Sequence, residues 1–242
     1  MKFFYLFYLK NSVSPFIGFV IIKAMYKSLI YESFGQPHQV LKFQERQQPS
    51  LQDQELLVNM LYAPVNPSDL IPITGAYAYR INLPAFAGYE GVGVVVGVGT
   101  GLSEELIGKR VLPLEGEGTW QTFVKCPMTH AFFVPDRLDS LSASQLYINP
   151  LTAWILCTEV LALRPGQKLA VNAAGSSLGQ LFAQLSQILG FDLIAITRHP
   201  EKHKLLKERG AHELRTDLIG LQVDAAIDCV GGQAGTDLAA CV

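Results

Sequence analysis

The sequence carries little charge, and neither sign dominates. Charged residues make up 17% of the 242 residues, and 19 Lys and Arg against 21 Asp and Glu give a formal net charge of −2. Without a basic excess there is no electrostatic basis for binding nucleic acid or an anionic membrane surface. The hydrophobic content of 49% excludes a disordered chain and is typical of a protein with a sizeable core. We therefore expect a globular protein whose partner is a small molecule.

Cysteine is scarce and widely spaced. The four residues form no CxxC pair and have no histidine at a zinc-finger interval: Cys126, Cys157, Cys229 and Cys241. This spacing argues against a disulfide framework and against a structural zinc site. Reduced, mostly buried thiols are typical of cytosolic proteins, so we expect a cytoplasmic location.

Long hydrophobic runs are also missing. The first two dozen residues contain two apolar runs, but Lys10, Asn11 and Ser12 separate them, and each is shorter than the ~20 residues that a membrane-spanning helix needs. A signal peptide is the alternative, although no small-x-small cleavage site precedes Lys23. We favour Met25 as the natural start, which makes residues 1–24 an extension that is not native.

Residues 25–148 have the pattern of a β domain. Short segments rich in Val, Leu, Ile and Tyr are bounded by Pro, Gly, Asn or Asp. The expected strands are 28–33, 55–65, 91–99, 109–114 and 122–126. Regular strand spacing with little helical periodicity predicts a β-barrel or a sandwich.

Residues 149–242 have a different, alternating pattern. A helical periodicity covers residues 141–163 and ends at Pro165-Gly166. Strands are then expected at 168–174, 191–197, 212–216 (weak) and 223–230, with helices at 180–190 and 200–210 between them. This alternation predicts an α/β fold with a doubly wound parallel sheet. Four strands are visible where a full dinucleotide fold has about six, so we expect an incomplete Rossmann domain.

The turn between the first strand and first helix of this second half is a candidate phosphate site. Its small residues and the helix N-terminus would let a pyrophosphate approach the backbone. The candidate residues are Gly175, Ser176, Ser177, Leu178 and Gly179. The turn lacks the three-glycine pattern, and a purely structural junction is the alternative.

The second strand of this half ends at Thr197, Arg198 and His199, about 20 residues beyond the turn. NAD sites place an acidic residue here for the ribose 2′-hydroxyl, whereas Arg198 could pair with a 2′-phosphate. These residues therefore favour NADPH over NADH. The alternative is that Arg198 is a solvated residue at a strand end.

Several motifs together resemble a known family. In order they are Asn66-Pro67-Ser68-Asp69, Thr74-Gly75-Ala76-Tyr77, Pro84 to Gly91, Asn149-Pro150-Leu151-Thr152-Ala153, the turn at 172–179, and Cys229-Val230-Gly231-Gly232. This ordered set, spread from about residue 28 to the end, resembles the medium-chain dehydrogenase/reductase superfamily, and within it the zinc-free quinone oxidoreductases and trans-2-enoyl-thioester reductases. The resemblance implies a GroES-like β-barrel over residues 25–148 and an NADP-binding Rossmann domain over 149–242, truncated at its C-terminus. It also implies a homodimer for a full-length relative.

The same resemblance argues against a metal site. Zinc-dependent relatives use Cys, His and a further Cys or Asp, but Tyr89 is at the His position here. The other two positions fall in 66–69 and 149–152, which offer no such ligand set. A zinc-dependent alcohol dehydrogenase is therefore the least favoured function.

The family chemistry delivers a hydride to the β-carbon of a conjugated carbonyl compound and a proton to its α-carbon or enolate oxygen. Tyr77 is at the position of the family's proton donor, with Tyr79 as a competing candidate and a packed loop aromatic as the alternative. Asn149 resembles a position beside the nicotinamide ribose, or else caps a helix or turn. Glu90 is expected to be an internal hydrogen-bonding partner, and Asp69 to cap the turn after Pro67.

The expected function is thus an NADPH-dependent reductase of a 2-enoyl thioester or a quinone. A catalytically inactive fragment or binding protein of the same family is the alternative.

Overall fold

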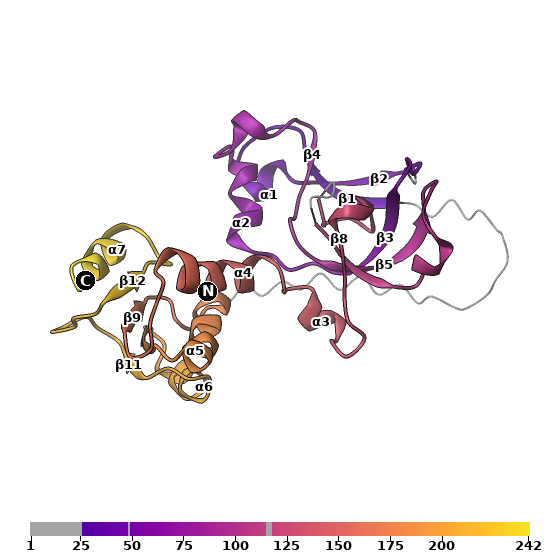
Figure 1. Ribbon diagram of the computed structural model, residues 1–242. Coiled ribbons are helices and arrows are strands. Elements are labelled where there is room, and N and C mark those ends of the chain that lie inside the picture. Colours follow the sequence, from indigo (N-terminus) through magenta and orange to yellow (C-terminus); the bar gives the residue numbers. More distant parts are fainter. Residues whose placement is uncertain (1–25, 48, 115–117) are drawn as a thin grey trace. The chain divides into compact units, whose positions relative to one another are not determined.

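The computed structural model describes residues 26–47, 49–114 and 118–242 (Figure 1). The expected extension, residues 1–24, lies outside the described residues. Contacts divide the chain into two units, one ending at Gln145 and the other spanning Leu146–Val242. Each unit has its own sheet structure and its own hydrophobic core. Across the described ranges, no helix is long and apolar enough to cross a membrane.

Two antiparallel sheets form the first unit. One has the strand order β7-β3-β5-β6-β8 and the other β2-β1-β4, and a bridge between Ser28 and Gln121 links β1 to the segment before β7. The strands are β1 (Tyr26–Tyr31), β2 (Lys42–Arg46), β3 (Glu55–Tyr62), β4 (Ala85–Phe86), β5 (Val92–Val98), β6 (Arg110–Pro113), β7 (Phe123–Pro127) and β8 (Ala131–Phe133). The helical segments are α1 (Pro37–Val40), α2 (Pro67–Leu70), η1 (Pro72–Thr74), η2 (Ala78–Arg80), η3 (Glu104–Leu106), η4 (Met128–His130) and α3 (Ser140–Ala143).

Alternating apolar residues build the core of this unit. Leu56 and Val58, two apart on β3, face the same side as Val95, Val111 and Val124 of the neighbouring strands, and all five are fully buried. Branched side chains fit this position because they pack well on a pleated surface. The predicted β domain is confirmed.

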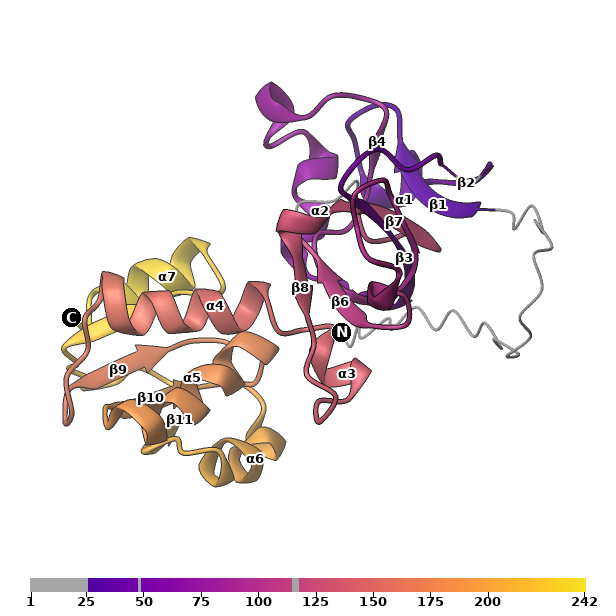
Figure 2. The same cartoon turned by 45° about the vertical axis from the view of Figure 1, so that its right-hand side comes forward.

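A parallel sheet of order β11-β10-β9-β12 forms the second unit. Leu169 and Leu193 face the core under α5 and α6, whereas Ala170 and Ile194 face Leu238 of α7. Helices therefore cover both faces, as Figure 2 shows for α6 and α7, and the predicted doubly wound α/β fold is confirmed. The elements are α4 (Ile148–Ile155), η5 (Leu156–Val160), β9 (Lys168–Val171), α5 (Ser177–Leu189), β10 (Asp192–Ile196), η6 (Pro200–Lys202), α6 (His203–Glu208), β11 (Glu213–Arg215), β12 (Ala225–Ile227) and α7 (Gly232–Ala239).

The single helix expected over 141–163 is wrong. The structure has α3, a break, and then α4 continued by a π-helical turn, η5. Pro150 explains the break, because proline is tolerated in the first turn of a helix but in its interior removes a hydrogen bond and clashes with the preceding turn. The helix must therefore restart just before Pro150.

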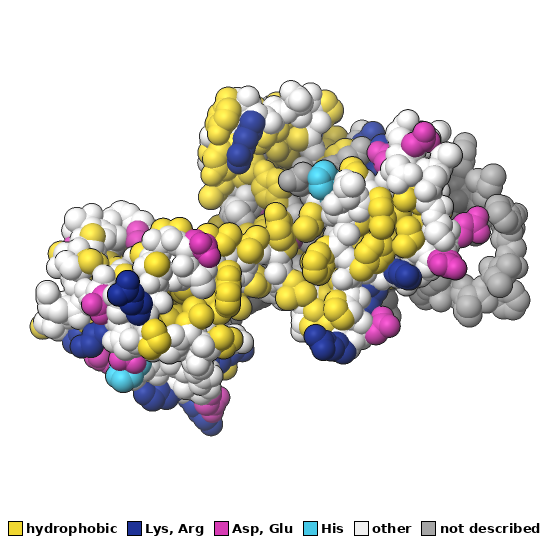
Figure 3. All heavy atoms as spheres, in the orientation of Figure 1, with side chains coloured by type: hydrophobic (Ala, Val, Ile, Leu, Met, Phe, Trp, Pro, Cys, Tyr) yellow, Lys and Arg dark blue, Asp and Glu magenta, His cyan; other side chains and the backbone are white. Residues whose placement is uncertain are grey.

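Apolar side chains of α4 are partly exposed. Leu151, Trp154 and Ile155 each keep 40–45% of their surface accessible, and hydrophobic side chains gather on the face shown in Figure 3.

All four cysteines are free, and only Cys229 is exposed, as the composition predicted. Burial raises the pKa of Cys157 to about 11, so this thiol stays protonated and inert at neutral pH.

Candidate cofactor and active site

The turn between β9 and α5 brings the five predicted phosphate-site residues together at the carboxyl end of the sheet. Ser176 is the N-cap of α5, and its Oγ accepts a hydrogen bond from the Gly179 N–H at 3.1 Å. A Cβ on Gly179 would collide with the carbonyl oxygen of Ala174. The Ala174 N–H in turn donates to Ile196 O of β10. The turn is thus held close to both the helix and the sheet, and glycine is needed for that approach.

The N-terminus of α5 offers unsatisfied donors. The N–H groups of Ser177 and Leu178 find no acceptor in the described part of the chain. Such groups, together with the helix dipole, attract an anion. If Gly175 carried a Cβ, its nearest neighbours would be Lys202 Cγ at 3.2 Å and Thr197 Oγ1 at 3.6 Å. The turn therefore has small backbone residues, free donors and an adjacent lysine, which fits a phosphate group.

The three predicted cofactor residues that follow β10 differ in burial and in their contacts. Thr197 is buried, and its Oγ1 accepts from the His199 N–H at 3.2 Å. Arg198 is exposed, and His199 Nδ1 lies 3.0 Å from Glu201 Oε1. Lys202 was not predicted as a site residue, because the sequence indicated a continuous helix over residues 200–210. The short η6 turn instead places its side chain next to Gly175.

A hydrogen-bonded clamp joins the ends of β9 and β12. Asn172 Nδ2 donates to Asp228 Oδ1 at 2.6 Å, and Asn172 Oδ1 accepts from the Cys229 N–H at 2.6 Å. Asp228 also accepts from the N–H groups of Val230 and Gly231. These bonds, first that from Asn172, hold the pKa of Asp228 below its ordinary value. The Cys229-to-Gly232 motif is thus fixed beside the cofactor turn.

The first unit contains a buried carboxylate pair. Asp69 and Glu90 are each 2% exposed. Asp69 accepts from the N–H of Asn66 at 2.6 Å and from the N–H of Tyr89 at 2.9 Å, and Asn66 Nδ2 donates to Glu90 Oε1 at 2.7 Å. Asp69 therefore caps α2, and Glu90 is an internal hydrogen-bonding partner, as the sequence predicted. The pair ties the α2 segment to the loop that carries Tyr89.

Tyr77 follows this anchored segment. Gly75, with φ of 94°, turns the chain from η1 toward Tyr77 in a conformation that favours glycine. Tyr77 is half-buried, and the Arg80 guanidinium lies 4.2 Å from the centroid of its ring, within cation–π distance. Tyr79, in contrast, is 83% exposed. Asn149, the remaining predicted cofactor residue, lies in the first turn of α4 in the second unit.

Asp69 makes the stability of the first unit depend on pH. Burial is the main cause that raises its pKa from 3.8 to about 6; the bonds from Asn66 and Tyr89 lower it, and the Glu90 carboxylate raises it. The folded protein holds this proton more tightly than the unfolded chain, so the stabilisation is complete below about pH 4 and is lost as the pH rises through about 6.

Asp69→Asn removes this titration and serves as the reference. Between about pH 4 and pH 7, we expect the free energy of unfolding of the wild type to fall by on the order of 2–3 kcal/mol relative to that of Asp69→Asn. Urea unfolding of both proteins across this range measures it, and a constant difference would contradict it.

The positions that correspond to the zinc ligands of metal-dependent relatives carry other groups here. Tyr89 offers a phenol, Asn66 an amide, and Asp69 is engaged by two N–H groups. Within the described ranges, no three His, Cys, Asp or Glu residues are grouped so as to hold a metal ion.

Comparison with known proteins places these features in a family. Residues 52–136 match the alcohol dehydrogenase GroES-like domain. The mitochondrial enoyl-[acyl-carrier-protein] reductase of Xenopus tropicalis is 34% identical over 229 residues, which cover 88% of this chain and 65% of the relative. The chain thus spans less than two thirds of the length of this relative.

Solved structures agree with that match. A Bacillus thuringiensis protein described as an NADPH:quinone reductase is 49% identical, with a TM-score of 0.83 over 90% of this chain and 69% of that one. Etr1p of Candida tropicalis, solved with NADP and crotonyl-CoA, is 27% identical, with a TM-score of 0.78 over 90% and 72% of the two chains. The chain therefore belongs to the medium-chain dehydrogenase/reductase superfamily, in its branch of enoyl-thioester and quinone reductases.

Proposed function

We propose that the chain is an NADPH-dependent reductase of a carbon–carbon double bond conjugated to a carbonyl group, as in a 2-enoyl thioester or a quinone. Relatives named as enoyl-thioester and quinone reductases support this choice of acceptor. The observation that carries it is the Tyr77 phenol, half-buried under the Arg80 guanidinium in a segment anchored by Asp69. In this proposal residues 25–148 are the catalytic domain and 149–242 the NADP-binding domain.

The second unit provides the cofactor contacts. The Ser177 and Leu178 N–H groups would bind the pyrophosphate, and Gly175 and Gly179 allow its close approach. Lys202 and Arg198 would neutralise a 2′-phosphate, which distinguishes NADPH from NADH. When bound, the nicotinamide supplies the hydride.

The first unit would supply the proton. The Tyr77 O–H donates to the α-carbon or the enolate oxygen of the reduced substrate, which leaves negative charge on the phenol oxygen. The Arg80 guanidinium, 4.2 Å from the ring centroid, holds the ring in place by stacking. Tyr89 in place of a zinc-ligating histidine supports chemistry without zinc.

The widely spaced free cysteines support a reducing compartment such as the cytoplasm, whereas several relatives are named as mitochondrial enzymes. A homodimer is part of the same proposal, and the Etr1p/Etr2p heterodimer shows that a relative assembles in pairs.

Cofactor selectivity gives a direct test in thermal unfolding. We expect NADPH to raise the melting temperature well above the shift given by NADH, since a ligand at a hundredfold excess over its Kd stabilises the fold by ~2.7 kcal/mol. The double variant Arg198→Ala, Lys202→Ala should lose most of the NADPH shift and keep the NADH shift. Lys204→Ala, which removes an exposed lysine of α6, is the matched control and should bind like wild type. Equal shifts with both cofactors in the wild type would exclude this assignment of the 2′-phosphate site.

A further inference from the structure

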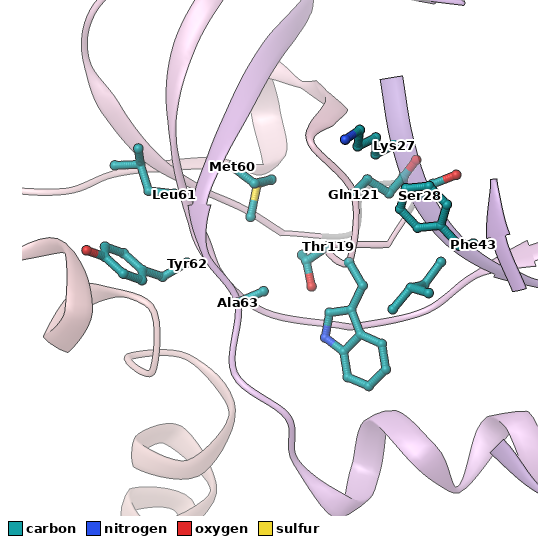
Figure 4. Close-up of a pocket in the computed structure, with 11 residues that line it drawn as sticks. Lys27, Ser28, Phe43, Met60, Leu61, Tyr62, Ala63, Thr119 and Gln121 are labelled. Atoms are coloured by element: carbon teal, nitrogen blue, oxygen red, sulfur yellow. The ribbon is translucent and has the colours of Figure 1, made fainter. Parts of the chain in front are cut away.

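A cavity of about 100 Å³ lies in the first unit, and its lining does not include the carboxylate pair or Tyr77 (Figure 4). Leu29 of β1, Met60 and Ala63 at the end of β3, and Trp120 provide most of its lining, which is mainly apolar. In Figure 4 the side chain of Met60 projects toward Thr119, whereas those of Leu61 and Tyr62 point the other way. The cavity thus has defined walls from three segments of the chain.

Two buried hydroxyl groups line the same cavity. Ser28 is 1% exposed and Thr119 is 2% exposed, and the side-chain oxygen of each has no hydrogen-bond partner among the described residues. Gln121, the third polar lining residue, differs: its Oε1 accepts from Tyr26 O–H at 2.6 Å and its Nε2 donates to Gly118 O at 2.9 Å. A buried hydroxyl without a partner destabilises a protein, so these two groups mark a place where a partner is expected.

Water would fill only part of this cavity. A buried water needs two to four polar partners, so the two hydroxyls suffice for one water molecule and the apolar walls offer no partners for a second. No charged group of the lining lies inside the cavity. Lys27, the charged lining residue, is exposed, and its Nζ lies 6.0 Å from the ring centroid of Phe43 at the rim. A neutral molecule with an apolar body and one oxygen would satisfy both features.

We propose that this cavity binds a small neutral organic molecule that carries one hydroxyl group, a short-chain alcohol. The size limits the ligand to about four heavy atoms, since an apolar cavity of about 150 Å³ accommodates the six of benzene and this one has about 100 Å³. The apolar body would contact Leu29, Met60 and Trp120, and the hydroxyl would exchange hydrogen bonds with Ser28 or Thr119.

The cavity adjoins the loop that leads to Tyr89. The Thr119 N–H donates to Gly88 O, the Trp120 N–H donates to Ala87 O, and Trp120 Nε1 donates to Pro64 O at 3.1 Å. A ligand that contacts Trp120 would therefore act on this loop through these hydrogen bonds. The site does not depend on the proposed reductase activity, and its test uses no turnover.

Trp120 offers a built-in reporter. The chain has two tryptophans, so Trp154→Phe in the full chain leaves Trp120 as the single source of indole fluorescence. Titration with propan-2-ol should change this emission saturably, with a Kd on the order of 1 mM, within the range open to ligands of about four heavy atoms. Thr119→Val, which keeps the shape and removes the hydroxyl, should weaken binding by about five-fold, the effect of one hydrogen bond.

Thr122→Val is the matched control. Thr122 is buried in the same segment, but its Oγ1 is satisfied by the N–H and the carbonyl of Lys27, both at 3.2 Å. We expect Thr122→Val to bind propan-2-ol like the parent and to melt at a lower temperature, whereas Thr119→Val melts no lower than the parent. Ser28→Ala removes the second unpartnered hydroxyl and tests its contribution to binding in the same way. A response that does not saturate, or equal affinity in the parent, Thr119→Val and Ser28→Ala, would overturn the proposal.

Discussion

Tyr77→Phe is expected to reduce turnover by about 10²- to 10⁴-fold, the range in which a positioned general acid contributes to a rate. Phenylalanine keeps the ring under the Arg80 guanidinium and removes only the proton that the enolate would receive. NADPH-dependent reduction of crotonyl-CoA and of a quinone, followed by the loss of NADPH absorbance, measures the effect. The melting-temperature shift caused by NADPH should stay as in the wild type, because the cofactor turn lies in the second unit.

Tyr79→Phe is the matched control for this result. Tyr79 is two residues away, is 83% exposed and was the competing candidate from the sequence, so its loss should change turnover little. If Tyr79→Phe abolished turnover and Tyr77→Phe did not, the roles would be reversed. If both variants kept full turnover, neither phenol would be the proton donor, and the proposed chemistry would need another acid.

Gly179→Ala should lower the free energy of unfolding by about 2 kcal/mol, within the range for inserting one methyl group into a packed site. Gly179 has an ordinary helical conformation, so the cost is purely steric: the new Cβ would meet the Ala174 carbonyl and push α5 away from the turn. The displaced turn should also bind NADPH more weakly. Urea unfolding and the NADPH-induced melting shift measure the two effects.

Ser177→Ala serves as the comparison for Gly179→Ala. It alters the same first turn of α5, but the Ser177 side chain makes no described hydrogen bond and alanine favours the helix. We expect its unfolding free energy to stay within about 0.5 kcal/mol of wild type, as is usual for such sites. A Gly179→Ala protein as stable as Ser177→Ala would show that the turn has room to relax.

The sequence allowed both halves of the fold to be predicted, because each has a clear periodicity. The strands with alternating burial, such as β7, and the apolar strands of the parallel sheet were found for that reason. Strand β2 was missed because all five of its residues are exposed, and β4 and β8 because they have only two and three residues. Helix α7 was missed because glycines at 232 and 235 weaken its helical signal.

The cofactor turn could be predicted from its position between a strand and a helix, but its neighbours could not. Lys202 lies close to Gly175 only because η6 bends the chain after β10. The Asn172–Asp228 clamp joins residues 56 positions apart, a pairing that the parallel sheet creates and that no local pattern shows. The same limit applies to Arg80 and Tyr77, which meet by side-chain stacking rather than by any sequence signal.

The bridge between Ser28 and Gln121 has a consequence for biosynthesis. The bond from Tyr26 to Gln121 and those between Lys27 and Thr122 each span 95 residues, so β1 cannot close the barrel until segment 118–122 has left the ribosome. At the usual ~5–20 residues per second this is a wait of roughly 5–20 s, during which β1 can pair only with β2 and, later, with the two-residue strand β4. The βαβ units of the second half close over much shorter distances in the chain. The nascent first half is therefore the stage at which this chain depends most on protection from aggregation.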